Sequence, residues 1–89
     1  MKPSFLPEEK KKEKQAALCD LIIHNDDVHT FAFVIDALMD ICKHDQIQAE
    51  QCTNIIHFNG KCGVKRGTFS ELKPKCEALI DKGLSAVIE

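Results

Sequence analysis

The feature that most restricts the fold is a stretch of apolar residues repeating at three- and four-residue intervals in the first half of the chain. The side chains that share this helical face are Phe31, Val34, Ile35, Leu38, Ile41 and Cys42. The residues that fall away from it are Ala32, Asp36, Asp40 and Lys43. This spacing predicts an amphipathic helix, and Thr30 before it is a suitable N-cap. Such a helix must bury its apolar stripe against another layer.

The segments around this helix predict a mixed fold. Residues 19–24 (CDLIIH) are apolar and stop at an Asx-rich turn, which is typical of a mostly buried strand. Residues 46–58 predict a second helix that ends at Asn59-Gly60. The side chains expected to share its stripe are Cys52, Ile55, Ile56 and Asn59. Residues 62–69 form a weaker strand prediction.

The last third of the chain predicts a third helix and a final strand. We expect Ser70 to cap the helix and Pro74 to lie in its first turn, where a missing N–H costs least. The face of this helix is expected to carry Leu72, Cys76, Leu79 and Ile80. Gly83 ends the helix, and residues 84–88 close the chain as a strand. The order is therefore βααβαβ, which indicates a two-layer α+β sandwich.

Length and composition limit the classes of protein that fit. The 89 residues suffice for one small domain, which we expect over residues 18–89. Residues 1–17, rich in Lys and Glu, are expected to form a flexible arm. A formal net charge of −2 argues against a nucleic-acid binder. No apolar run reaches the roughly 20 residues of a membrane span, and the N-terminus does not read as a secretory signal.

The cysteine pattern indicates a reducing compartment. Five cysteines are present, an odd number without a CxxC pair. We therefore expect free thiols, several of them buried as small hydrophobic groups, in a cytoplasmic protein.

A polar cluster follows the first strand. Asn25, Asp26 and Asp27 stand together, although one Asx residue is enough to make a turn. His57, near the end of the second helix, would reach this cluster if the two helices stack side by side. An amide oxygen, a carboxylate and a neutral imidazole nitrogen would then offer three acceptors. A primary ammonium has three donors and no acceptor, so it is the complementary ligand.

These residues resemble the ClpS family, the N-degron adaptors of the bacterial Clp protease. The resemblance rests on Asn25-Asp26-Asp27, on the motif Phe33-Val34-Ile35-Asp36-x-Leu38, on His57 and on Gly60-x-Cys62-Gly63-Val64. It covers about 70 residues, and Glu71-x-Lys73 extends it more weakly. The resemblance implies three helices on one face of a three-stranded antiparallel sheet. It also implies a non-enzymatic adaptor without a cofactor.

The resemblance also implies roles for individual residues. Asn25, Asp26 and His57 would hold the α-ammonium group of a substrate whose first residue is Leu, Phe, Tyr or Trp, and Asp27 would support the turn. The apolar pocket for that first side chain would comprise Phe31, Val34, Thr53, Ile56 and Leu84. Phe31 and Thr53 stand where the family usually has methionine.

The implied partners are N-degron substrate proteins and the N-terminal domain of a AAA+ unfoldase of the ClpA or ClpC class. Glu71 and Lys73 match the surface that docks on the unfoldase, although exposed charges on a helix are usually just solvated. We expect a monomer that contacts neither nucleic acid nor a membrane.

Other readings of the polar residues stay open. The potential ligands of a metal-binding module are His24, Asp26, His29 and His57. A stalk-like protein-interaction module would use the same fold without needing the polar cluster. A small hydrolase with an Asp–His pair is disfavoured, because no serine or threonine stands in a nucleophile elbow.

Overall fold

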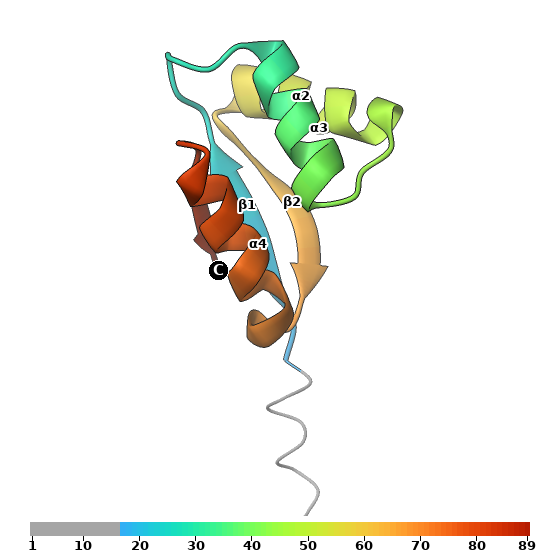
Figure 1. Cartoon of the computed structure of the whole chain (residues 1–89), viewed down its shortest axis with the longest axis vertical. Helices are drawn as coiled ribbons and strands as arrows, with labels where there is room; N and C mark the ends of the chain where they lie inside the picture. The colour runs from blue at the N-terminus through green and yellow to red at the C-terminus, as the bar shows by residue number, and fades with distance from the viewer. Residues whose placement is uncertain (1–16) are drawn as a thin grey trace, which may run out of the picture.

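The computed structural model describes residues 17–89 and has the βααβαβ order expected from the sequence (Figure 1). The elements are β1 (Cys19–His24), α2 (Phe31–Ile41), α3 (Gln46–Asn59), β2 (Lys61–Gly67), α4 (Phe69–Asp81) and β3 (Ser85–Ile88). The arm expected over residues 1–17 lies outside the described residues, apart from Ala17.

The sheet is antiparallel with strand order β2-β1-β3, and the three helices cover one of its faces (Figure 1). Leu21 and Ile23 of the central strand point into the core, as the two-residue side-chain period requires. A bulge interrupts the pairing of β1 with β2, where the register passes from Leu21–Lys65 to Ile22–Gly63 and skips Val64. The α+β sandwich predicted from the sequence is confirmed.

The core lies between the sheet and the helices. Its buried side chains are Leu21, Ile23, Val34, Ala37, Leu38, Cys42, Ala49, Ile56, Val64, Leu72, Cys76, Leu79, Leu84 and Ala86. The stripe expected on α3 was wrong in part, because its buried face carries Ala49, Thr53 and Ile56. Ile55 is 41% exposed and Asn59 is exposed as well. Of the expected stripe, Ile56 is buried and Cys52 is half-buried against the core, so the buried face is only partly rotated from the expected one.

Side-chain caps fix where the helices begin. Thr30 caps α2 as expected, since its Oγ1 accepts from the Phe33 N–H at 3.1 Å. Asp45 does the same for α3 through the Gln48 N–H at 2.8 Å.

The start of α4 differs from the prediction. Its N-cap is Thr68 and not Ser70, because Thr68 and Glu71 form a reciprocal capping box. Pro74 therefore lies in the second turn of α4, where it cannot donate to the carbonyl of Ser70. Ile80, expected on the buried face, is 51% exposed.

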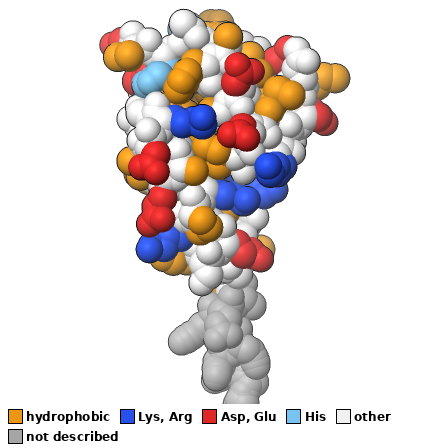
Figure 2. All heavy atoms as spheres, in the orientation of Figure 1, with side chains coloured by type: hydrophobic (Ala, Val, Ile, Leu, Met, Phe, Trp, Pro, Cys, Tyr) orange, Lys and Arg blue, Asp and Glu red, His pale blue; other side chains and the backbone are white. Residues whose placement is uncertain are grey.

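The surface mixes residue types. On the face seen in Figure 2, hydrophobic side chains are spread among charged and polar ones, with several at the end where α2 and α3 lie. None of the helices within residues 17–89 has the length and apolar character that crossing a membrane requires. All five cysteines are free thiols, and Cys42 and Cys76 are buried as expected.

Candidate functional site

The loop between β1 and α2 is organised by the carboxylate of Asp26. Its Oδ1 accepts from the backbone N–H groups of Val28 and His29, both at 2.9 Å. Its Oδ2 lies 2.9 Å from Nδ1 of His29. A carboxylate only accepts, so the ring nitrogen of His29 donates in this contact. The turn hydrogen bonds that we expected from Asp27 thus come from Asp26.

These contacts keep Asp26 ionised. The backbone N–H of His29 lowers the pKa of the Asp26 carboxyl, against the opposing effect of burial. The His29 ring and the Val28 N–H lower the pKa of Asp26 further. Oδ2 keeps one lone pair free for a ligand, because it accepts only the bond from His29 within residues 17–89.

A backbone hydrogen bond brings the end of α3 to this loop. The Asn25 N–H donates to the carbonyl of Gly60 at 2.8 Å. Gly60 ends α3 in a left-handed conformation with φ of 94°, which a glycine adopts without strain. His57 lies three residues earlier, and its ring meets that of Phe31 edge-on at a centroid distance of 5.1 Å. Helices α2 and α3 therefore lie side by side, which is the arrangement that brings His57 to the Asx cluster.

A cavity of about 310 Å³ opens between the loop, α2 and α3. Its lining residues are Asn25, Asp26, Asp27, His29, Thr30, Phe31, Val34, Thr53, Ile56 and His57. All of the candidate residues for ammonium and side-chain binding are therefore brought together, with one exception. Leu84 is 4% exposed and packs in the core, and it does not line this cavity.

Two lining residues were not picked out by the sequence analysis as part of the pocket. His29 follows Asp26 at a three-residue interval, the spacing at which an Asx side chain commonly bonds with its neighbours. That spacing is the signal that points to His29. Thr30 was recognised only as a helix cap, and it lines the cavity as well.

The cavity is polar at one side and apolar at the other. The hydroxyl of Thr53 donates to the Ala49 carbonyl at 2.7 Å, so its hydrogen is used within α3. Together with Val34 and Ile56, Thr53 forms a buried wall, while Phe31 is 42% exposed. Such a site is complementary to a ligand with a cationic head and a large apolar side chain.

The remaining candidate residues lie elsewhere. Glu71 accepts from the Thr68 N–H in the capping box, and Lys73 forms an ion pair with Glu77 at 3.3 Å on the exposed face of α4. Within residues 17–89, no group of three or more His, Cys, Asp or Glu side chains is arranged to hold a metal ion.

Comparisons with known proteins agree on one family. The family described as ATP-dependent Clp protease adaptor protein ClpS matches residues 14–87. The ATP-dependent Clp protease adapter protein ClpS of Pectobacterium carotovorum subsp. carotovorum (strain PC1) is 33% identical over 72 residues, which cover 76% of this chain and 68% of that protein. The structure of Agrobacterium tumefaciens ClpS2 bound to L-phenylalaninamide is similar in fold. Its TM-score is 0.74 at 20% identity, covering 81% of this chain and 94% of that one.

Proposed function

Because this chain belongs to the ClpS family of ATP-dependent Clp protease adaptors, we propose that it binds substrate proteins by a free N-terminal Leu, Phe, Tyr or Trp. The family is non-catalytic, so the chain is an adaptor and not an enzyme. The observation that carries the proposal is the cavity that joins Asn25, Asp26 and His57 to an apolar wall. The phenylalaninamide bound by the Agrobacterium ClpS2 has the matching chemistry, a free amino group beside a benzyl side chain.

In this proposal the polar side of the cavity binds the free N-terminal amino group of the substrate. The α-ammonium donates to the amide oxygen of Asn25, to Oδ2 of Asp26 and to a neutral His57 ring. An acetylated or internal residue would leave these acceptors desolvated and unpaired, at a cost of about 1–3 kcal/mol for each group.

The apolar side then selects the first side chain. Transfer of a Leu or Phe side chain from water into the cavity contributes about 1.5–3 kcal/mol. The rings of Phe31 and His57 border the cavity and flank a bound side chain. The cavity volume of about 310 Å³ accommodates one such side chain with its amino group.

The proposal also covers delivery of the bound substrate to an unfoldase. We expect the bound substrate to be handed to a AAA+ unfoldase of the ClpA or ClpC class by a monomeric, cytoplasmic adaptor. Glu71 and Lys73 on α4 are the proposed docking residues for the N-terminal domain of the unfoldase.

A peptide panel tests the binding step. Fluorescence anisotropy is measured for labelled peptides that differ only in their first residue, each with an N-acetylated control. We expect free N-terminal Leu, Phe, Tyr and Trp to bind and Ala, Lys and all acetylated peptides to fail. Equal binding of acetylated and free peptides would contradict the proposal.

Asp26→Asn is the variant that tests the charge. It keeps an oxygen for the turn bonds from Val28 and His29 but removes the negative charge. We expect at least tenfold weaker peptide binding, since hydrogen bonds to charged groups contribute about 1.5–3 kcal/mol. A cooperative thermal unfolding transition, even at a somewhat lower temperature than that of the parent chain, would show that the fold is retained.

A further inference from the structure

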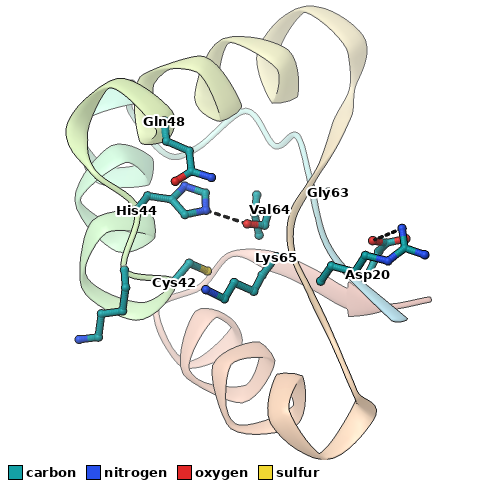
Figure 3. Close-up of a pocket in the computed structure, with 9 residues that line it drawn as sticks. Asp20, Cys42, His44, Gln48, Gly63, Val64 and Lys65 are labelled. Carbon is teal, nitrogen blue, oxygen red and sulfur yellow. Dashed lines mark hydrogen bonds and ion pairs between the residues drawn. The ribbon is translucent and has the colours of Figure 1, made fainter. Parts of the chain in front are cut away.

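A second pocket, of about 380 Å³, lies at the other end of α3 from His57. Its lining residues are Asp20, Cys42, Lys43, His44, Gln48, Gly63, Val64, Lys65 and Arg66. They come from the α2–α3 link, the first turn of α3, β1 and the bulged part of β2 (Figure 3). The pocket shares no residue with the cavity around His57.

His44 is the unusual residue of this pocket. Its side chain is 5% exposed, and its Nε2 lies 2.7 Å from the carbonyl of Val64, the residue that the bulge leaves out of the strand register. Figure 3 shows the ring directed from the α2–α3 link toward this carbonyl. A carbonyl only accepts, so Nε2 carries the hydrogen, and in this Nε2–H tautomer Nδ1 is an acceptor.

That acceptor is unsatisfied. Nδ1 of His44 is the one buried side-chain nitrogen or oxygen without a hydrogen-bond partner in residues 17–89. A buried polar atom left unpaired is costly, and native structures hold few of them. A ligand that donates a hydrogen bond at this point would remove the penalty.

The charge around the pocket is positive. Neither Lys43 nor Lys65 has an ion-pair partner in the part of the chain that the structure describes, and Arg66 faces Asp20 at 3.7 Å. Burial raises the pKa of the Cys42 thiol, although Lys75 and Lys65 act against it, so this sulfur stays neutral and does not repel an anion. The pocket therefore presents two uncompensated cations beside one acceptor.

We propose that this pocket binds inorganic hydrogen phosphate. Its anionic oxygens accept from Lys43 and Lys65, and its P–OH group donates to Nδ1 of His44. Gln48, an exposed side chain, lines the same pocket beside His44. Sulfate and carboxylate ions carry the negative charge but have no hydrogen to donate, so they satisfy only half of the site.

NMR of the imidazole nitrogens of the full chain tests this directly. Sodium phosphate, sodium sulfate and sodium chloride are titrated at matched ionic strength and at fixed neutral pH. We expect phosphate to shift the Nδ1 signal of His44 saturably, in the direction of a nitrogen that gains a hydrogen bond. Equal shifts with phosphate and sulfate, or with all three salts, would overturn the proposal.

Matched charge variants locate the site. Lys65→Gln is expected to weaken phosphate binding about fivefold, the upper range for an exposed ion pair. Lys82→Gln, which removes another exposed lysine after α4, is the control and should leave phosphate binding unchanged. The same loss in both variants would mean that only net charge matters, and the assigned pocket would be wrong.

Binding of a Phe-initiated peptide is measured in parallel. Because the two pockets have no residue in common, Lys65→Gln should leave peptide affinity as it is. Phosphate binding and peptide binding can therefore fail independently of each other.

Discussion

At the scale of single residues, Asp26 combines two tasks. Its Oδ1 holds the loop through two backbone N–H groups, and its Oδ2 faces His29 and the cavity. The three adjacent Asx residues are therefore not equivalent. Asp27 is exposed, and its side chain makes no hydrogen bond or ion pair with the described residues.

The lowered pKa of Asp26 predicts a dependence of stability on pH. Its folded-state pKa lies below the unfolded value, so the stabilisation is complete above about pH 4 and is lost as the pH falls through the folded-state pKa. We expect the urea midpoint of Asp26→Asn to lie below that of the parent chain at pH 7 and to approach it at strongly acidic pH. Asp27→Asn is the matched control, with no change expected at either pH. A constant deficit of Asp26→Asn at all pH values would refute the assignment.

Thr53 predicts how the affinity of the cavity for apolar side chains can be raised. Its hydroxyl already bonds to Ala49 within α3, so the exchange Thr53→Val replaces a satisfied polar group by a methyl group of similar size. We expect affinity for Leu- and Phe-initiated peptides to rise severalfold. The gain in binding free energy should not exceed about 0.8 kcal/mol, the contribution of one buried apolar carbon. Titration of the two peptides by anisotropy measures this. Weaker binding of both would show that the hydroxyl contacts the ligand.

At the scale of elements, the helix boundaries separate what the sequence predicts well from what it predicts poorly. The caps of α2 and α3 and the stop at Gly60 follow local rules of hydrogen bonding, and the strands of β1 and β3 follow their apolar pattern. The buried face of α3 was missed because its inner side carries the small or polar Ala49 and Thr53, which hydrophobic periodicity does not detect.

The start of α4 was missed for a different reason. Both Thr68 and Ser70 are good caps, and only Thr68 has a glutamate at the third position to complete the box. For the candidate site, the grouping of Asn25, Asp26 and His57 was predicted only from the family resemblance. Contacts across the fold, such as the bond from Asn25 to Gly60, carry no local signal.

The capping box gives a direct comparison of the two candidate caps. Thr68→Ala removes the acceptor for the Glu71 N–H, and we expect a loss of about 1 kcal/mol in the free energy of unfolding. Ser70→Ala in the first turn of α4 should change it by less than about 0.5 kcal/mol, as for most exposed substitutions. Chemical denaturation of both variants decides between them, and a larger loss for Ser70→Ala would restore the boundary that the sequence suggested.

At the scale of the whole molecule, the loop between β1 and α2 is supported from the far end of the chain. A Cβ at Gly83, after α4, would lie 3.1 Å from Nε2 of His29, whose other nitrogen bonds to Asp26. The turn before β3 thus lies against the residue that orients the carboxylate of the site.

This contact predicts an energetic coupling between the two segments. Gly83→Ala should destabilise the fold by about 1–2 kcal/mol, because φ at this position is 94°, and should weaken peptide binding by displacing His29. In the His29→Ala background, the clash between the new Cβ and the imidazole ring disappears. The strain of the positive φ remains. A double-mutant cycle on unfolding free energy and on peptide affinity measures the difference. Strict additivity in both would show that the two residues do not interact.

The lining of the cavity beside His57 has one further consequence. None of its side chains comes from a β-strand, and only Val34 and Ile56 among them belong to the buried hydrophobic cluster. The other two residues of the candidate apolar pocket in this lining, Phe31 and Thr53, lie outside that cluster. Exchanges at these two positions would alter the width and polarity of the opening while leaving the architecture as it is. The proposed preference for the first residue of a substrate can therefore be altered by substitution without a compensating change in the scaffold.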